Sequence, residues 1–257
     1  MNKLKFLLKY FIYYLKAKSK HGVHPPFLYH LVTQVINDKK KYNEYTIAET
    51  YRSNLLNNNT EIYCEDFGTG ISGNRKISAI AMHSAKSAKY AQLMFRLIKE
   101  MNPNTILELG TSLGVSTTYM ALACSSARIK TIEGSATIAT IAKENFIKNN
   151  YKNINVVTDT IEIALKNILE ENKTVDVVFF DGNHRKQPTL NYFEQCLSYH
   201  NNNTVFIFDD IHWSDEMEEA WEHIIANKKV TLSIDLFFLG IVFFRKELSK
   251  ENFLIRF

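Results

Sequence analysis

The sequence predicts an α/β fold: a doubly wound, mostly parallel sheet with helices on both faces. Short runs rich in β-branched and aromatic residues alternate with amphipathic segments of about ten to twenty residues, which is typical of parallel strands connected by helices. The last two strand-like runs, 230–238 and 241–245, are joined only at Leu239-Gly240, and so short a joint permits only an antiparallel hairpin. The runs expected as parallel strands are 105–109, 128–132, 154–157, 175–180 and 205–208.

The composition is that of a globular protein, and a length of 257 residues suits one large α/β domain. Hydrophobic residues make up 46% of the chain and charged residues 23%, which excludes a disordered protein, a collagen-like repeat and a polytopic membrane protein. The net charge of +4 is too small to indicate a nucleic-acid-binding protein. The three cysteines form no CxxC pair, so no zinc site or disulfide framework is expected, and the cytoplasm is the simplest location.

Residues 1–75 are expected to form a helical N-terminal extension and loop, and residues 76–257 the main domain. Within the extension, residues 3–20 predict a basic amphipathic helix, because four lysines lie within about 60° of one another on a helical projection. This segment is too short to span a bilayer and is not expected to be a signal sequence. The helix is expected to pack on its own domain or on a twin subunit of a homodimer; the alternative is peripheral contact with anionic lipid. Residues 53–76 are polar and predict a loop. The four lysines are Lys5, Lys9, Lys16 and Lys20.

The first expected strand leads into a turn that contains two glycines four residues apart, Gly110 and Gly114. Such a turn lets the backbone approach a ligand closely, and Ser116 or Thr117 can bind the first amides of the helix that follows. The turn lacks the middle glycine of the GxGxxG dinucleotide motif, and it has an acid, Glu108, two residues before the first glycine. Taken alone, it is equally compatible with a structural turn.

Acidic residues also end the next three strands. Glu133 and Gly134 follow the second strand, Asp159 the third and Asp181 the fourth. The carboxyl ends of the strands line the ligand crevice in open α/β sheets. One such acid is commonly a solvated turn residue, but four acids at consecutive strand ends, 22 to 26 residues apart, indicate a binding site.

These motifs resemble those of the class I S-adenosylmethionine-dependent methyltransferases, especially the catechol and caffeoyl-coenzyme A O-methyltransferase branch, over roughly residues 80–245. The resemblance implies a seven-stranded sheet in the order 3-2-1-4-5-7-6 that ends in the antiparallel hairpin. It also implies that Glu133 holds the ribose hydroxyls of the cofactor and Asp159 the amine of its adenine. The expected cofactor-binding residues are Glu108, Gly110, Thr111, Ser112, Gly114, Ser116, Glu133, Gly134, Asp159 and Asp181.

The fifth strand is followed by Asp209 and Asp210, and the resemblance implies that these two acids and Asp181 bind one divalent ion, usually Mg²⁺. The sequence departs from that branch at two positions. Asp210 stands where an asparagine is usual, and His184 stands where the branch carries a lysine base. The expected catalytic residues are Asp181 and His184, with His184 as general base, and His212 is the rival base. Metal binding or simple packing remains open for His184.

The sequence therefore predicts an enzyme that transfers the methyl group of S-adenosylmethionine to an oxygen of a small or lipid-like acceptor, with a divalent metal as a candidate cofactor. The expected partner is a small-molecule acceptor and not a nucleic acid. The alternative is a catalytically silent cofactor-binding or scaffold protein. An NAD-dependent oxidoreductase shares the sheet and the ribose acid, but the missing GxGxxG motif and the terminal hairpin argue against it.

Overall fold

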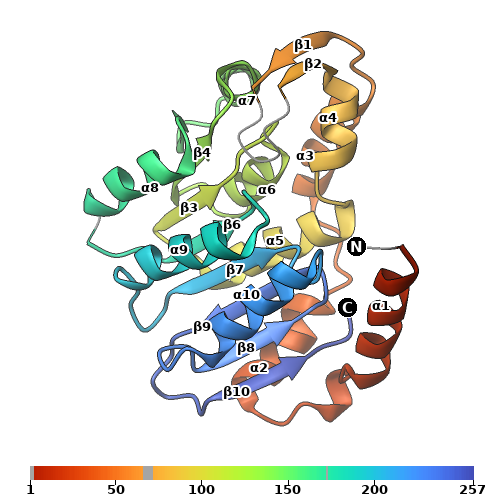
Figure 1. The fold of residues 1–257 in the computed structure, drawn as a ribbon, viewed down its shortest axis with the longest axis vertical. Helices are drawn as coiled ribbons and strands as arrows, with labels where there is room; N and C mark the ends of the chain where they lie inside the picture. Colours follow the sequence, from red (N-terminus) through yellow and green to blue (C-terminus); the bar gives the residue numbers. More distant parts are fainter. Residues whose placement is uncertain (1–2, 66–71, 172) are drawn as a thin grey trace. The chain divides into compact units, whose positions relative to one another are not determined.

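The computed structural model describes residues 3–65, 72–171 and 173–257, and it divides into two compact units. Unit 1 combines the two ends of the chain, Met1–Asn37 and Ile168–Phe257, and unit 2 is the middle, Asp38–Asn167. In Figure 1 the N-terminal helices of unit 1 are red and its C-terminal strands are blue. The division cuts the expected N-terminal extension at Asn37, so a domain boundary near residue 75 stays a prediction.

Unit 2 contains the first three parallel strands of the expected sheet. Strands β3, β4 and β5 pair in that order and in parallel. Their β-branched residues suit strands that are covered by helices, and most of β3 is buried. Helix α6 follows β3, and α7 follows β4. The bounds are β3 Thr105–Leu109, β4 Arg128–Glu133, β5 Ile154–Thr158, α6 Val115–Ala123 and α7 Ala136–Lys148.

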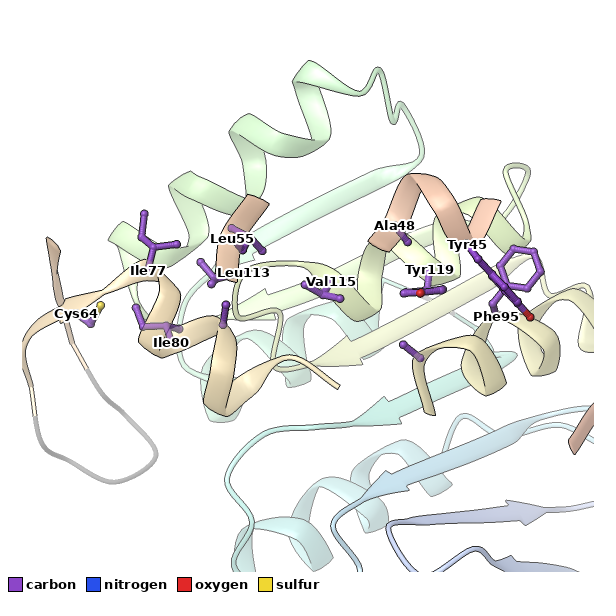
Figure 2. Packing of buried hydrophobic residues seen from close by; sticks show 12 residues of the cluster. Tyr45, Ala48, Leu55, Cys64, Ile77, Ile80, Phe95, Leu113, Val115 and Tyr119 are labelled. Carbon is purple, nitrogen blue, oxygen red and sulfur yellow. The ribbon is translucent and has the colours of Figure 1, made fainter. Parts of the chain in front are cut away.

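Three further helices of unit 2 pack around the start of α6. They are α3 (Asn43–Leu56), α4 (Ile77–Ser84) and α5 (Ala88–Met101). Figure 2 shows the buried cluster that they share, in which Tyr45 of α3 lies near Phe95 of α5, with 5.1 Å between the ring centroids. Leu113 and Val115 belong to the same cluster. The turn from Gly110 to Gly114, called the glycine turn below, therefore packs against a buried apolar cluster.

The loop expected at residues 53–76 is wrong over most of its length. Residues 53–56 complete α3, and β1 (Glu61–Cys64) pairs with β2 (Gly73–Lys76) in an antiparallel hairpin. The hairpin is held by its ladder and by Cys64, which is buried in the apolar cluster of unit 2. Strands of four residues that are mostly exposed show too little hydrophobic alternation to be recognised in a sequence. Residues 66–71 lie outside the described residues.

Unit 1 contains the remaining strands, in the order β10-β8-β9-β7-β6. β6 and β7 are parallel, and β9 is antiparallel to both β7 and β8, which is the predicted terminal hairpin. β10 adds a strand parallel to β8. The bounds are β6 Val177–Phe180, β7 Val205–Asp209, β8 Leu232–Asp235, β9 Leu239–Phe243, β10 Glu251–Leu254, α9 Lys186–Leu197 and α10 Asp215–Ala226.

The predicted fold class is confirmed. Unit 2 carries the 3-2-1 part of the expected strand order and unit 1 the 4-5-7-6 part, with only the hairpin strand β9 antiparallel to its neighbours. Helix α8 (Ile161–Glu170) lies between β5 and β6 in the sequence. The fold is therefore the α/β fold with a mostly parallel sheet that the alternating pattern predicted.

The N-terminal part of unit 1 is helical, as expected. Helix α1 (Lys3–Lys16) is followed by a 3-10 turn at Lys20–Gly22, by α2 (Pro26–His30) and by a π-helical segment at Leu31–Ile36. Helix α1 thus ends before Lys20, so that lysine does not continue the stripe on α1. Across the described ranges, no helix has both the length and the apolar character that a membrane crossing requires.

Close packing in unit 1 makes Gly240 of β9 sensitive to substitution. A Cβ atom at this position would lie 2.5 Å from the ring of Trp221, which is itself buried. We expect Gly240→Ala to lower the free energy of unfolding by about 1–3 kcal/mol, because the ring must shift within a dense core. Urea unfolding measures this loss. Gly73→Ala is the control, since a Cβ there meets no atom within 4 Å, and equal losses for both variants would contradict the packing argument.

Candidate functional site

Glu108 of β3 is completely buried and has specific hydrogen-bond partners. Its Oε2 accepts hydrogen bonds from the hydroxyls of Thr117 in α6 and Thr131 in β4. Thr131 is also within 2.6 Å of the hydroxyl of Thr111. A buried carboxyl group needs such donors. Glu108 was predicted to bind cofactor, and this stays a prediction. Its contacts in the structure join strands β3 and β4 and helix α6 beneath the turn.

The turn after β3 has an unusual backbone that depends on glycine. Gly110 has a φ of 105° and Gly114 a φ of 77°, a region that residues with a Cβ rarely adopt. The amides of Gly110 and Thr111 both donate to the carbonyl of Ile132, at 3.1 and 2.9 Å. A Cβ at Gly114 would also lie 2.5 Å from the ring of Phe146. The turn is therefore held in one shape against the end of β4.

The helix start after this turn differs from the expectation. Gly114 is the N-cap of α6, and no side chain caps its first amides. Ser116 lies inside the helix and is buried, and Thr117 binds Glu108, so the expectation that either residue caps α6 is wrong. The cap is missing because both residues lie within the first turn and not ahead of it. Amides without a side-chain cap at a helix N-terminus suit a polar or anionic ligand group.

Glu133 connects the glycine turn to the end of β4. Its Oε2 accepts a hydrogen bond from the backbone amide of Ser112 at 2.8 Å, and its Oε1 accepts one from the amide of Ser135 at 2.9 Å. Ser112 has a φ of 47°, and its hydroxyl lies 2.7 Å from that of Ser84. The carboxylate of Glu133 is thus oriented by two backbone donors and is only partly buried, as is Gly134.

Asp159 lies next to Glu133 at the end of the neighbouring strand. Its backbone amide donates to the carbonyl of Glu133 at 3.1 Å, and its Oδ1 accepts a hydrogen bond from the amide of Thr160. Unit 2 therefore brings Glu133, Asp159 and the glycine turn to the carboxyl ends of three adjacent strands. Two carboxylates and a set of backbone amides in this position can hold hydroxyl and amino groups of a ligand.

Unit 1 brings together a second group of predicted site residues. Asp181, His184 and Asp209 each offer a ligand atom, and these atoms all lie within 4.8 Å of one another. The two aspartates are adjacent because β6 and β7 are parallel with Phe180 paired to Phe208. Asp181, just after β6, and Asp209, the last residue of β7, therefore reach the same edge. The Nε2 of His184 lies 3.8 Å from the Oδ1 of Asp181. Asp209 is 1% exposed, so water has almost no access to the part of the cluster that Asp209 forms.

Asp210, the third predicted metal ligand, is absent from the cluster that the described residues form. Its φ is 52°, its amide donates to the carbonyl of Phe238 at 2.7 Å, and its own carbonyl accepts from the amide of Trp213. These backbone bonds define the turn after β7. His184 contributes the third ligand atom of the observed cluster instead.

His212, the rival base, has both ring nitrogens engaged. Nδ1 lies 2.9 Å from Glu218 Oε1 and Nε2 lies 2.8 Å from Asp235 Oδ2, and the ring stacks on Phe237. Burial lowers the pKa of His212, but the hydrogen bonds and charges of Asp235 and Glu218 outweigh burial, so the pKa is raised above 6.5. An imidazolium between two carboxylates has no free nitrogen for a substrate, and this geometry favours a structural role.

A separate cavity of about 550 Å³ lies in unit 2 between α3 and α7, and its walls include Tyr51, Asn54, Ile141 and Asn145. It contains none of the predicted site residues. The hydroxyl of Tyr51 donates to the carbonyl of Leu113, so one wall of the cavity supports the glycine turn from behind.

Known proteins match the part of the chain that carries these groups. Residues 107–211 match a family model described as a methyltransferase domain, and this range includes the glycine turn, Glu133 and the Asp181–His184–Asp209 cluster. This part of the chain is therefore similar to a methyltransferase domain. A stretch of 140 residues is 25% identical to an uncharacterised protein of Acanthamoeba polyphaga mimivirus. That stretch is 50% of this chain and spans 62% of the relative's length.

Solved methyltransferases have a similar fold. An O-methyltransferase from Bacillus cereus in complex with S-adenosylhomocysteine has a TM-score of 0.57 and 22% identity, covering 80% of this chain and 92% of that one. An S-adenosylhomocysteine-bound methyltransferase from Podospora anserina has a TM-score of 0.61 and 14% identity, covering 87% and 99%. An O-methyltransferase from Streptomyces achromogenes in complex with S-adenosylmethionine has a TM-score of 0.56 and 17% identity, covering 85% and 95%. The predicted resemblance to class I methyltransferases is confirmed.

Sequence reasoning did not find every residue that shapes the candidate site and its surroundings. Thr117 and Thr131 were not recognised as partners of Glu108, because a threonine in a helix or strand carries no signal of its own. Lys9 was assigned only to a lysine stripe, yet it binds Glu218, the partner of His212. Only the folded chain brings these positions together.

The environment of His212 predicts a pH-dependent stability. A histidine whose pKa is raised by folding stabilises the protein fully below its unfolded pKa, near 6.5, and this stabilisation is lost as the pH rises through the higher folded value. We expect the free energy of unfolding to fall over that window. His212→Gln should remove this dependence and cost about 1–3 kcal/mol below pH 6.5, because buried Asp235 and half-buried Glu218 lose a charged partner. Urea unfolding across pH tests this, with exposed His223→Gln as the control; identical pH profiles for wild type and His212→Gln would refute it.

Proposed function

We propose that this chain transfers the methyl group of S-adenosylmethionine to an oxygen atom of a small-molecule acceptor, with a divalent ion held by unit 1. The observation that carries the proposal is the pair of Glu133 and the glycine turn, locked together by the hydrogen bond from the Ser112 amide. The methyltransferase domain match and the cofactor complexes of structures with a similar fold support the choice of cofactor.

The groups of unit 2 suit an adenosine ligand. The amides of Ser112 and Ser135 orient the carboxylate of Glu133 at the carboxyl end of β4. We assign this carboxylate to the ribose hydroxyls, because a carboxylate accepts hydrogen bonds from hydroxyl groups. Asp159, one strand further along, is the proposed acceptor for the adenine amine. Gly110 carries no side chain at the end of β3, so the cofactor can approach the backbone closely there.

The cluster of unit 1 fits a divalent cation. Two ligand atoms that share one ion at about 2.1 Å lie at most about 4.2 Å apart. The separation of 3.8 Å between His184 Nε2 and Asp181 Oδ1 is within this limit, and the bound of 4.8 Å for all three residues requires a small side-chain movement when the ion binds. Two carboxylates and one imidazole suit Mg²⁺ or Mn²⁺, with the nitrogen favouring the softer ion. We therefore assign Asp181, His184 and Asp209 as the ligands, with Asp210 outside the set.

Methyl transfer to oxygen requires alignment and a deprotonated acceptor and little covalent help from the protein. A bound divalent ion would lower the pKa of an acceptor hydroxyl. Asp181 and Asp209 hold the negative charge that retains such an ion. His184 cannot act as ligand and general base at the same time through Nε2, and the ligand assignment replaces the base role expected for it.

Glu133→Ala is expected to lower the affinity for S-adenosylhomocysteine about tenfold or more, because charge-assisted bonds to ribose are worth roughly 1.5–3 kcal/mol. Calorimetry measures the change. Glu144→Ala, an exposed acid on α7, is the matched control. Because Glu133 also binds two backbone amides, a thermal unfolding curve must accompany each titration. A folded Glu133→Ala protein with unchanged affinity would remove Glu133 from the cofactor site.

The metal assignment predicts different results at two neighbouring aspartates. Asp209→Asn is expected to weaken Mn²⁺ binding by at least about tenfold and to leave S-adenosylhomocysteine binding nearly unchanged, since a ligand charge is lost from unit 1 alone. Asp210→Asn, the matched neighbour, should leave Mn²⁺ affinity nearly unchanged. Calorimetry or Mn²⁺ paramagnetic resonance measures both. A larger effect at Asp210 than at Asp209 would restore the ligand set implied by the family resemblance.

A further inference from the structure

Two lysines of helix α1, Lys5 and Lys9, pair with acids at the start of α10 in unit 1. The Nζ atoms of Lys5 and Lys9 lie 2.7 and 2.8 Å from the carboxylate of Asp215, and Lys9 also binds Glu218. Both acids belong to the first turn of α10. The hydrogen bonds from Lys5 and Lys9 lower the pKa of Asp215 to about 2. The ion pairs define which side of α1 faces the protein.

Aromatic packing holds the same side of α1. Phe6, Tyr10 and Tyr13 surround the ring of Phe237, with centroid distances of 5.3, 4.9 and 5.2 Å. The hydroxyl of Tyr13 donates to the carbonyl of Ile255. The inner face is therefore occupied by lysines and aromatic rings.

The outer face of α1 is apolar and exposed, which reverses the usual arrangement of a surface helix. Leu4 is 74% exposed and Leu15 is 65% exposed, and the whole set covers an arc of about 160° at about 100° per residue. The outer face consists of Leu4, Leu7, Leu8, Phe11, Ile12, Tyr14 and Leu15. A contiguous set of large exposed apolar side chains marks an interaction surface.

The N-terminal segment that carries this outer face contains basic residues and no acidic ones. No aspartate or glutamate occurs before Asp38, whereas Lys16, Lys18 and Lys20 follow the apolar face directly and are exposed. A symmetric dimer through this face would place the same lysines opposite one another, with no acid in the segment to pair with them. An anionic surface matches both the apolar arc and the lysines beside it.

We propose that the outer face of α1 docks the protein on a membrane surface that contains anionic lipid. At about 1.5 Å per residue the 14 residues of α1 extend about 21 Å, less than the hydrocarbon core of about 30 Å, so the helix lies in the interface and does not cross it. The apolar side chains enter the boundary of the acyl chains, and Lys16, Lys18 and Lys20 contact the head groups. The ion pairs with α10 keep the outer face turned away from unit 1. This inference is independent of the proposed methyl transfer.

Co-sedimentation of the full chain with vesicles tests the proposal directly. The expected result is binding to phosphatidylcholine vesicles that contain phosphatidylserine, weaker binding to phosphatidylcholine alone, and weakening by added salt. Leu8→Glu combined with Phe11→Glu should reduce binding by at least about tenfold, and so should Lys16→Glu combined with Lys20→Glu. All four side chains are exposed, so the variants should fold, which thermal unfolding verifies.

The matched control is Ile147→Glu combined with Ile163→Glu, two exposed isoleucines of unit 2 that are 78% and 56% exposed. This control should bind vesicles as the wild type does. An equal loss of binding in the control, or no binding of the wild type to phosphatidylserine vesicles, overturns the proposal. So does a wild-type dimer in lipid-free analytical ultracentrifugation that the Leu8→Glu and Phe11→Glu changes dissociate, because the outer face would then bind a second copy.

Discussion

The buried carboxyl group of Glu108 is the interaction on which the shape of the candidate cofactor site depends. Because no water reaches it, its hydrogen-bond partners must come from the protein, and Thr117 and Thr131 supply them from α6 and β4. This arrangement fixes the start of α6 relative to the end of β4, and the glycine turn connects these two points. Glu133 can then orient its carboxylate on the amides of Ser112 and Ser135.

Most of the parallel sheet could be predicted from the sequence because buried strands leave a strong signal. The run 175–180 is apolar almost throughout, and the structure makes β6 of Val177–Phe180 with every residue buried. The same reasoning fails for β1 and β2, whose four-residue strands are mostly exposed and are stabilised by backbone pairing and by the burial of Cys64. Backbone hydrogen bonds between two exposed strands leave no recognisable pattern in the local sequence.

The acids of the site were predictable for a similar reason, and their partners were not. Asp181 directly follows buried β6 and Asp209 ends buried β7, so a parallel register alone brings them to one edge. The turn after Asp209 depends instead on a bond from the Asp210 amide to the carbonyl of Phe238, 28 residues away. In the described residues His184, and not Asp210, completes the observed cluster. His212 is comparable, since Asp235 becomes its partner only in the folded chain.

The orientation of α1 shows why a periodic pattern alone could not distinguish its two faces. The lysine stripe predicted an amphipathic helix that packs on its own domain or on a twin subunit, but it did not show that acids at the start of α10 pair with Lys5 and Lys9. Asp215 and Glu218 suit the positive end of the α10 dipole, and the same carboxylates attract Lys5 and Lys9. Exposed ion pairs contribute little to stability. The aromatic rings around Phe237 therefore contribute most of the free energy that holds α1 against the rest of unit 1. The ion pairs select the orientation, and that selection leaves the leucines of α1 exposed to the surroundings.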